Sequence, residues 1–345
     1  MGTARNSGQP RTEVCITVDT EFSIGGAFAD PAKFRPVGED HALCPAGGEE
    51  NGLPFILNTL ARFHFPATFF IETLNTAYFG ETPLRTIADR ILTAGQDLQL
   101  HLHPCWLHFR HSDWIERLRN GTPDDRCSGR SLDEMVSIIA AGLEPFERWD
   151  WPRPIASRTG GLAVDRTVFQ AMAKMGLHLG SNIGFGTRHH LRDPELQVQA
   201  GRRFIEGVLE IPILAFARLA NQRLKHYHLL TITGVSTPEM ISVLRAARAA
   251  AISPVVILTH PHEFVKHAPP GRPGVRPNRI NKNRLVSLCE FLADNADEYV
   301  PMSFQEGGPR WLQQGAHDVP EISAPALPSV VTLLQNGAND YVKWL

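Results

Sequence analysis

The chain is poor in cysteine and has no arrangement of cysteines that indicates cross-linking. Five cysteines occur in 345 residues, an odd number, and none forms a C-x-x-C pair. They are spread along the chain as Cys15, Cys44, Cys105, Cys127 and Cys289. This distribution argues against a disulfide framework and against a zinc site built from thiolates, and it favours a reducing compartment.

Net charge and long apolar runs are also lacking. The formal net charge is -2, so no overall field favours nucleic acid or an anionic membrane. No stretch approaches the ~18 consecutive apolar residues of a membrane span. The polar first residues, MGTARNSGQPRTE, contain no apolar core of the signal-peptide kind. We therefore expect a cytoplasmic protein with no nucleic-acid partner and no membrane span.

Short apolar runs alternate with amphipathic helical segments through most of the chain. Strands of this length between helices of three to four turns are typical of βα units around a parallel sheet. With seven or eight units, the sheet is expected to close into a TIM-like barrel. Strands are predicted at 14–18, 67–71, 98–103, 154–158, 178–183, 208–213, 255–260 and 299–304. Helices are predicted at 53–63, 84–95, 131–146, 165–176, 237–251 (with Thr237 as its cap) and 282–296.

Two histidines stand at the end of the predicted strand 98–103. His101 and His103 are two residues apart, so in a strand their side chains point the same way. Pro104 has no N–H and ends the strand there. The active sites of βα barrels lie at the C-terminal ends of the strands. A core or surface role is as common for an isolated H-x-H pair, so other strand ends must decide.

Polar side chains close three more predicted strands at the same end of the barrel. Each alone has a commoner structural explanation, such as a helix cap or a surface ion pair. Together, two imidazoles and one or two carboxylates form a 2-His-1-carboxylate set, which binds a divalent metal and leaves positions open for water and substrate. Zinc is the first candidate. The additional residues are Asp19 and Glu21 after the first strand, Arg158 after the fourth, and His260 and His262 after the seventh.

Four short motifs together resemble a known family. TVDTE (17–21), HLHP (101–104), SRTGG (157–161) and ILTHPHEF (257–264) occur in the order and spacing of the polysaccharide deacetylases, the NodB-homology or carbohydrate esterase 4 group. GGLAVD and LEIPI are similar to its intermediate motifs. The resemblance covers about residues 12–305. It implies a distorted (β/α)7 barrel in a single domain, with loop insertions at the C-terminal face, and metal-dependent removal of an N-acetyl group from an amino sugar or polysaccharide.

The resemblance also implies roles for the strand-end residues. Asp19 corresponds to the general base, although the family usually has two adjacent aspartates where Thr20 and Glu21 stand here. Glu21 shares a face with Asp19 and is the expected metal ligand. The family usually spaces its two ligand histidines four apart. Cys105 occupies that position after His101, so the His-Pro pair at His103 is the better match.

The remaining motifs supply supporting roles by the same resemblance. Arg158 corresponds to the arginine that pairs with the base and orients it. His260 corresponds to the histidine that protonates the leaving amine, after metal-activated water has attacked the amide. His262 is expected to grip substrate or to support a ligand. Trp106 is expected to stack on a sugar ring, although core packing is the commoner use of tryptophan.

The domain layout follows from the resemblance and from the absence of an internal repeat or linker. We expect a disordered N-terminus at 1–11, the polysaccharide deacetylase-like barrel at 12–305 and a C-terminal extension at 306–345. Residues 22–50 and 104–130 follow catalytic-end strands and are expected to shape the substrate cleft. The basic loop 267–284 is either a lid for an anionic substrate or a solvated loop. Its cations are Arg272, Arg276, Arg279, Lys282 and Arg284.

Two alternatives to an N-acetyl sugar deacetylase stay open at this point. One is an amidohydrolase of another small C–N substrate, similar to an allantoinase, which some barrels of this family resemble. The other is a catalytically silent carbohydrate-binding barrel, which Thr20 and the compressed histidine spacing allow. A bound stoichiometric metal argues against the silent barrel, and acetate release argues against the small-amide alternative.

Overall fold

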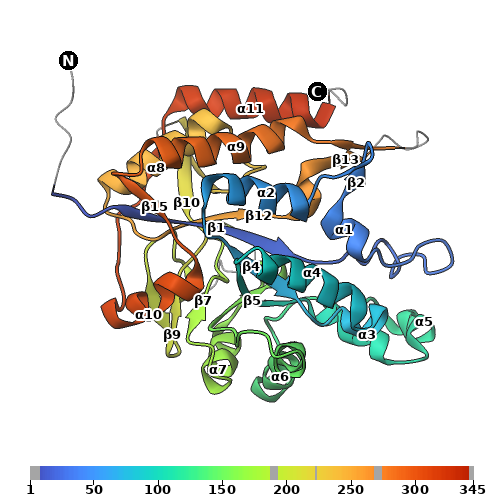
Figure 1. Cartoon of the computed structure of the whole chain (residues 1–345). Helices are drawn as coiled ribbons and strands as arrows, with labels where there is room; N and C mark the ends of the chain where they lie inside the picture. The colour runs from blue at the N-terminus through green and yellow to red at the C-terminus, as the bar shows by residue number, and fades with distance from the viewer. Residues whose placement is uncertain (1–7, 187–192, 222–223, 268–273, 342–345) are drawn as a thin grey trace.

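The computed structural model describes residues 8–186, 193–221, 224–267 and 274–341. Its centre is a parallel sheet whose strands follow one another around a curve (Figure 1). All eight expected strands are present. In spatial order they are β12 (Val255–Thr259), β1 (Thr12–Thr20), β4 (Thr68–Glu72), β5 (Asp97–Leu102), β6 (Ala156–Thr159), β7 (Leu179–Gly180) and β9 (Val208–Glu210), with β15 (Tyr299–Pro301) beside β1. A ninth strand of this sheet, β8 (Arg203–Ile205), was not expected and is antiparallel to β9.

The curled sheet returns towards its first strand just after β9. Ile213 forms isolated parallel bridges with Gly184 on one side and with Val256 of β12 on the other. The N–H of Leu214 donates to the Val256 carbonyl at 3.1 Å, which adds a second link across the gap. The expected α/β class and distorted barrel are confirmed. The barrel is a curled half-barrel whose two edges are linked by short bridges and not by a full strand ladder.

Alternate residues of the strands face two separate apolar clusters. In β1, Val14, Ile16 and Val18 belong to the large outer cluster, whereas Cys15 belongs to a smaller inner one. This alternation is the period of two expected for a strand buried on both faces. The inner cluster also contains Trp311, which is fully buried. The barrel interior is therefore filled by side chains rather than hollow.

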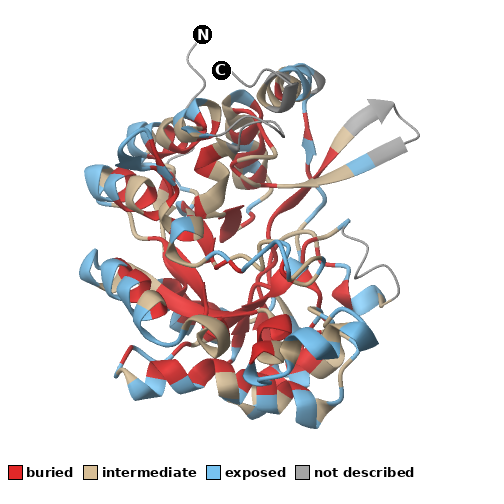
Figure 2. Ribbon diagram, turned by 90° about the vertical axis from the view of Figure 1, so that its right-hand side faces the viewer, coloured by how far each residue is buried: buried red, intermediate tan, exposed pale blue. Residues whose placement is uncertain are grey.

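Helices cover the outer face of the sheet and expose their polar sides, as Figure 2 shows by the blue outer surfaces around red strands. All six expected helices are present. The cap expected at Thr237 is wrong, because Ser236 is the N-cap and its side chain accepts from the Glu239 N–H, while Thr237 already has a place in the helix. The helices are α2 (Leu53–Phe63), α4 (Thr82–Thr93), α6 (Leu132–Arg148), α7 (Arg166–Lys174), α8 (Thr237–Ala249) and α9 (Arg279–Asp294).

The insertions after the first and third parallel strands form small elements. Residues 22–50 contain α1 (Glu39–Leu43), β2 (Pro45–Ala46) and β3 (Glu49–Glu50), and residues 104–130 contain η1 (Pro104–Arg110), α5 (Trp114–Arg117) and η2 (Leu118–Asn120). Other short elements are α3 (Thr76–Phe79), η3 (Gly160–Leu162), η4 (Pro194–Leu196), β10 (Ala215–Asn221), β11 (Leu224–Leu229), η5 (Pro261–Phe264), β13 (Val265–His267), β14 (Val275–Pro277) and β16 (Ser323–Ala324).

The last part of the chain packs on the barrel in two places. Helix α10 (Phe304–Gln314) lies against the starts of the strands, because the Phe304 N–H donates to Thr68 Oγ1 and the Gln305 N–H donates to Asp97 Oδ2. The expected boundary at 305–306 therefore falls inside a helix. Helix α10 covers the end of the barrel opposite to the strand ends that carry the motifs.

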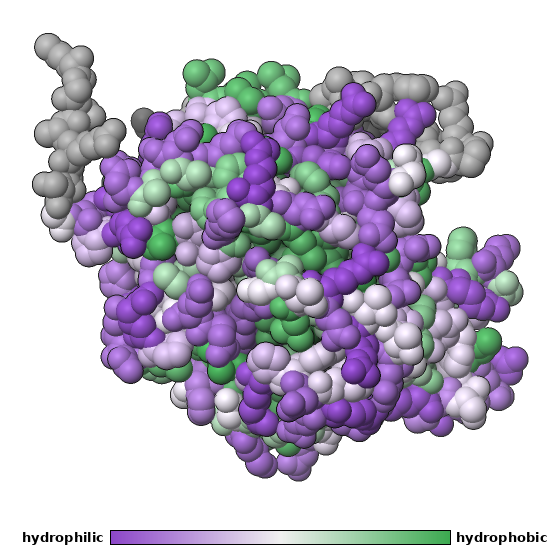
Figure 3. All heavy atoms as spheres, viewed as in Figure 1, coloured by the Kyte–Doolittle hydropathy of each residue, from purple (hydrophilic) through white to green (hydrophobic). Residues whose placement is uncertain are grey.

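Helix α11 (Ala326–Tyr341) lies on α8, with Thr332 Oγ1 donating to Ser236 Oγ. Its outward side is apolar, and Figure 3 shows hydrophobic residues gathered over this helix at the top of the molecule. The exposed residues are Leu327, Val330, Leu333 and Leu334. Of the expected disordered N-terminus, residues 1–7 lie outside the described residues. Within the described ranges, no helix has the length and apolarity needed to cross a membrane.

Candidate active site and metal centre

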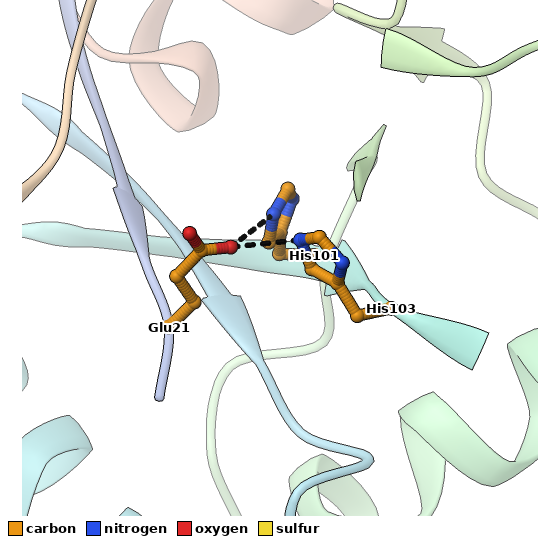
Figure 4. Close-up of side chains that lie close together, drawn as sticks. All are labelled: Glu21, His101 and His103. Carbon is orange, nitrogen blue, oxygen red and sulfur yellow. Dashed lines mark ion pairs between the residues drawn. The ribbon is translucent and has the colours of Figure 1, made fainter. Parts of the chain in front are cut away.

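The carboxylate of Glu21 and the imidazoles of His101 and His103 meet at the C-terminal ends of β1 and β5 (Figure 4). Glu21 Oε2 lies 3.3 Å from His101 Nε2 and 2.7 Å from His103 Nε2. The two rings are 4.9 Å apart between centroids. His101 is the last residue but one of β5 and His103 follows the strand, so the two side chains share a face as the alternation predicts. One ligand atom from each residue lies within 4.8 Å of the others.

The second nitrogen of each imidazole is held by an oxygen. His101 Nδ1 lies 3.0 Å from the backbone carbonyl of Arg158, and His103 Nδ1 lies 2.6 Å from Asp125 Oδ2. Because a carbonyl only accepts, His101 carries a proton on Nδ1, and its Nε2 faces Glu21. Metal-ligating histidines are oriented by such contacts to carbonyls and carboxylates. The donor set therefore fits a divalent cation with open coordination positions, of which zinc is a common occupant.

Glu21 and His103 favour each other's charged form in the protein alone. Burial would raise the pKa of Glu21, but the charge of His103 and the hydrogen bonds from both imidazoles hold it well below its usual range. Burial would lower the pKa of His103, but the carboxylates of Glu21 and Asp125 raise it well above its usual range. Without a cation, Glu21 and His103 are thus an ion pair. A bound divalent cation would take the place of that proton.

Asp19 and Arg158 form a buried ion pair behind the three candidate ligands. Arg158 Nη1 lies 2.6 Å from Asp19 Oδ1, and the two side chains are 0% and 5% exposed. The rest of the guanidinium is also bound: Nε and Nη2 donate to the carbonyl and hydroxyl of Ser181, and Nη1 also donates to Thr17 Oγ1. Its carbon lies 4.2 Å from the ring centroid of Phe70. Asp19 is therefore held in one orientation by a cation that is itself immobilised.

His260 faces the other oxygen of the Asp19 carboxylate. Its Nε2 lies 3.9 Å from Asp19 Oδ2, and its Nδ1 lies 3.0 Å from Glu263 Oε1. Glu263 is fixed in turn, because its Oε2 accepts from Thr259 Oγ1 at 2.8 Å and from the His260 N–H at 3.1 Å. Burial favours the neutral imidazole, but the Glu263 carboxylate outweighs it and raises the pKa of His260 to about 9. His260 is therefore an imidazolium at neutral pH.

A further carboxyl, which the sequence reasoning missed, lies at the end of β4. Glu72 is opposite His101 in the ladder, is fully buried and accepts from the N–H groups of Leu74 and Asn75 at 2.6 and 2.9 Å. Burial raises its pKa to about 8, against the lowering effect of His103. The rule used for the other strand ends would have found it, because Glu72 directly follows the predicted strand 67–71.

Three other supporting residues were not assigned from the sequence. Glu263 stands three residues after His260, a spacing that lets its carboxylate contact the His260 ring and N–H. The ILTHPHEF motif could therefore have indicated this supporting role. Asp125 lies 22 residues after His103 in a loop, and Ser181 lies 23 residues after Arg158. Nothing local in the sequence connects either of them to its partner.

His262 lies beside two other imidazoles. Its ring centroid is 5.1 Å from that of His260 and 4.6 Å from that of His41, which comes from α1 and is stacked at 22° to it. Glu21, His41 and His262 form a second group whose ligand atoms lie within 4.8 Å of one another. His41 was not singled out from the sequence, because α1 lies in an insertion with little periodicity.

The expected role of Trp106 is corrected by the structure. Its side chain is 1% exposed and packs against Phe79 and Phe109, with ring centroids 5.7 and 5.5 Å away. No face of the indole is open to a sugar, so Trp106 belongs to the core. The apolar neighbours come from α3 and η1, segments whose contact the sequence pattern does not reveal.

The expected basic lid also changes with the structure. Arg272 lies outside the described residues, whereas Arg279, Lys282 and Arg284 belong to α9. Arg284 is 2% exposed and donates to the carbonyls of Ile232 and Thr233. It joins α9 to the loop before α8 and is not available to an anionic substrate.

Comparisons with known proteins report on the fold. No protein-family model matches the sequence, and no curated protein matches it. A structure from Mycobacterium smegmatis, whose name assigns it to the polysaccharide deacetylases, is 19% identical, with a TM-score of 0.51 over 91% of this chain and 96% of that one.

Two further structures align with lower scores. A family 4 carbohydrate esterase from Streptomyces lividans is 13% identical, with a TM-score of 0.43 over 90% of this chain and 98% of that one. A carbohydrate esterase 4 pseudoenzyme from Bacillus anthracis is 11% identical, with a TM-score of 0.43 over 91% of this chain and 69% of that one. The fold assignment rests on the Mycobacterium smegmatis structure, whose TM-score exceeds 0.5. This chain therefore has the polysaccharide deacetylase fold, the one that its TVDTE, HLHP, SRTGG and ILTHPHEF motifs lead us to expect.

Proposed function

We propose that the protein is a metal-dependent hydrolase that removes N-acetyl groups from an amino sugar or polysaccharide. The observation that carries this proposal is one constellation at one end of the barrel. Three candidate metal ligands, Glu21, His101 and His103, lie beside the buried pair of Asp19 and Arg158. His260 completes the group at 3.9 Å from Asp19. The polysaccharide deacetylase fold supports the same reaction class.

Glu21, His101 and His103 would hold the metal. When bound there, a divalent cation such as zinc polarises an amide carbonyl and lowers the pKa of water from ~15.7 towards ~7. The hydrogen bonds at the two Nδ1 atoms keep both Nε2 atoms directed at this position. Asp125 and the Arg158 carbonyl thus act as positioning groups for the ligands.

Asp19 is the proposed general base. Arg158 binds one carboxylate oxygen, Oδ1, and leaves Oδ2 directed towards His260. Oδ2 would accept the proton of the attacking water, while Arg158 prevents the carboxylate from turning. A positioned base typically contributes ~10² to 10⁴ in rate.

His260 is the proposed general acid. It would donate from Nε2 to the amine nitrogen as the C–N bond breaks, which releases acetate and the amino sugar. Glu263 binds Nδ1 and favours the charged, proton-carrying imidazole. Acid and base therefore stand at the ends of two neighbouring strands, β12 and β1, with the scissile amide expected between them and the metal ligands.

The test is acetate release from a panel of N-acetylated sugars and oligosaccharides, with and without chelator and with zinc added back. We expect activity that is lost on chelation, restored by zinc and absent in His101→Ala. His111→Ala, which changes an exposed imidazole outside the site, serves as the matched control and should keep full activity. Chelator-insensitive turnover, or full turnover by His101→Ala, would refute the assignment. Turnover of small amides without any acetate release would favour the alternative substrate class.

A further inference from the structure

Glu21 belongs to two groups of potential metal ligands. Among the described residues, its carboxylate is grouped once with His101 and His103, and once with His41 and His262. The dashed contacts of Figure 4 occupy one oxygen, Oε2, and the other carboxylate oxygen points away from His101 and His103. A carboxylate can bind one cation through each oxygen. The geometry therefore offers this one carboxylate two separate pairs of imidazole ligands.

The second pair of imidazoles is placed by elements that contact each other. His41 is in α1, His262 is in η5, and these two elements pack together. Their contact includes Cys44 Sγ, which lies 3.4 Å from the Pro261 carbonyl oxygen. The closeness of the two rings, 4.6 Å between centroids, is thus a property of the local fold.

Helix α9 fixes η5 from the other side. The side-chain amides of Asn278 and Asn281 both donate to the Glu263 carbonyl, at 3.2 and 2.8 Å. His262 therefore stands on a short segment that is anchored one residue later by two hydrogen bonds. A preorganised ligand of this kind loses little conformational entropy when it binds.

We propose that the protein binds a second divalent cation through Glu21, His41 and His262, so that Glu21 bridges two metal ions. Imidazole nitrogen and carboxylate oxygen are ligands that suit zinc and other first-row divalent metals. Hydrolases with two metal ions hold them about 3.5 to 4 Å apart. This inference rests on the proposed function, because Glu21 is also a ligand of the first ion.

The surroundings can accept the additional positive charge and give it access. Asp19, Glu21 and Glu263 place three carboxylates around His260, where the nearby cations are the Arg158 guanidinium and the imidazolium of His260 itself. A cavity of about 580 Å³ opens beside His41 and His262. Its lining includes His41, His262, Glu263, Lys266, Asn278 and Asn281. The oxygen-rich lining allows a cation to enter with part of its water shell, although Lys266 opposes it.

The second ion would change how substrate is held. With one ion, the substrate amide and the attacking water share the open positions of a single cation. With two, an additional substrate oxygen, such as a hydroxyl next to the acetamido group, finds a cation of its own. The chemical class that fits is therefore an acetamido sugar with a neighbouring hydroxyl or carboxylate oxygen.

The experiment is a count of metal ions in the full-length protein. Metal-free protein is titrated with Zn²⁺ and, in parallel, equilibrated with Zn²⁺ and analysed for metal content. We expect two ions per chain in the wild type and one each in His41→Ala, His262→Ala and His101→Ala. The control His111→Ala should bind two. Glu21→Gln should bind both ions more weakly, because it removes the shared carboxylate.

Mn²⁺ supplies a readout that does not depend on activity. Two Mn²⁺ ions bridged by a carboxylate give an exchange-coupled electron paramagnetic resonance spectrum, and a single ion gives the uncoupled six-line spectrum. We expect coupling in the wild type and its loss in His262→Ala. Circular dichroism checks that each variant is folded. If His262→Ala does not fold, His262→Gln is measured in its place.

One ion per chain in the wild type would overturn the second site and leave the proposed function standing, provided that acetate is released. Two ions whose number is unchanged by both His41→Ala and His262→Ala would overturn it as well, because the second ion would then bind elsewhere. Two bridged ions without deacetylation would keep the second site and refute the proposed function. The two ideas therefore fail in distinguishable ways.

Discussion

The α-carbon of Gly160 lies against the imidazole of His103. A β-carbon at this position would be 2.3 Å from His103 Cε1 and 2.5 Å from Nδ1, distances that no pair of atoms in van der Waals contact shows. Gly160 is thus needed for space, whereas the next residue, Gly161, has φ of +58° and nothing within 4 Å of its missing β-carbon. The two glycines of SRTGG therefore serve different purposes, and the first makes room for a candidate metal ligand.

Gly160→Ala is expected to displace His103 and to weaken metal binding at least ~10-fold without changing any ligand, since ligand-orienting contacts are typically worth 10–100-fold. Gly161→Ala is the control. It should cost stability by about 1 kcal/mol, because it places a side chain in the left-handed region, but leave metal affinity unchanged. Competition against a chelator of known affinity measures both. Wild-type affinity in Gly160→Ala would show that His103 is not a ligand.

Asp125→Asn is expected to weaken zinc binding by about 10- to 100-fold, because Asp125 orients the His103 ring through Nδ1. Asp124→Asn removes the same charge one residue away, where the carboxylate binds Arg126 on the surface instead. Isothermal titration of metal-free protein compares the two variants. Equal losses in both would mean that only the local negative charge matters, and not the contact to the ring.

Arg158→Met is expected to destabilise the protein by about 3–5 kcal/mol, because it leaves the Asp19 carboxylate buried without its partner. Adding Asp19→Asn should recover part of this loss, since the unpaired charge is then gone. Urea unfolding of the two single variants and the double variant gives the coupling free energy. Strict additivity would contradict a direct interaction between these side chains in the folded protein.

Glu263→Gln is expected to lower kcat more than it changes KM, because the amide keeps a hydrogen bond to His260 but no longer favours the charged imidazole. The loss should lie within the 10²- to 10⁴-fold range of general acid catalysis. Glu290→Gln, on the exposed side of α9, is the matched control. Steady-state kinetics on an N-acetylated substrate gives kcat and KM for both variants. A change in KM alone in Glu263→Gln would contradict the proposal that Glu263 acts by keeping His260 charged.

Glu210 is expected to make stability depend on pH below neutrality. Burial raises its pKa to about 7, despite hydrogen bonds from Asn182 and Ile183 that favour the carboxylate. A carboxyl with a raised pKa binds its proton more tightly when folded, so its contribution is present at low pH and is lost as pH rises from about 4.5 to about 7. Urea midpoints at pH 5 and pH 8 should therefore differ less in Glu210→Gln than in the wild type. The control is Glu116→Gln, an exposed change that should leave the difference as it is.

The strands and helices could be predicted from the periodicity of apolar residues, and the site residues from the strand ends. Every expected strand and helix is present, because βα units repeat a strong pattern of apolar runs and amphipathic helices. The strand-end rule also identified side chains that the structure brings together, as for Glu21, His101 and His103. It works because parallel strands align their C-terminal ends at one edge of the sheet.

What could not be predicted depends on loops. Asp125 and His41 reach the site from insertions whose conformation is set by tertiary packing and not by local pattern. Trp106 follows the HLHP motif directly, yet it turns into the core because η1 packs on α3. The start of α8 was misplaced by one residue because Ser236 and Thr237 are both good caps, and only the backbone geometry separates them.

Arg158 contributes to the site with both its side chain and its backbone. The guanidinium binds Asp19, and the carbonyl of the same residue binds the ring of His101. A displacement of β6 would therefore carry the proposed base and a proposed metal ligand along together, and their separation would be preserved while the barrel flexes. The distance between the proposed base and this proposed metal ligand is therefore set by one strand residue and not by the loops around it.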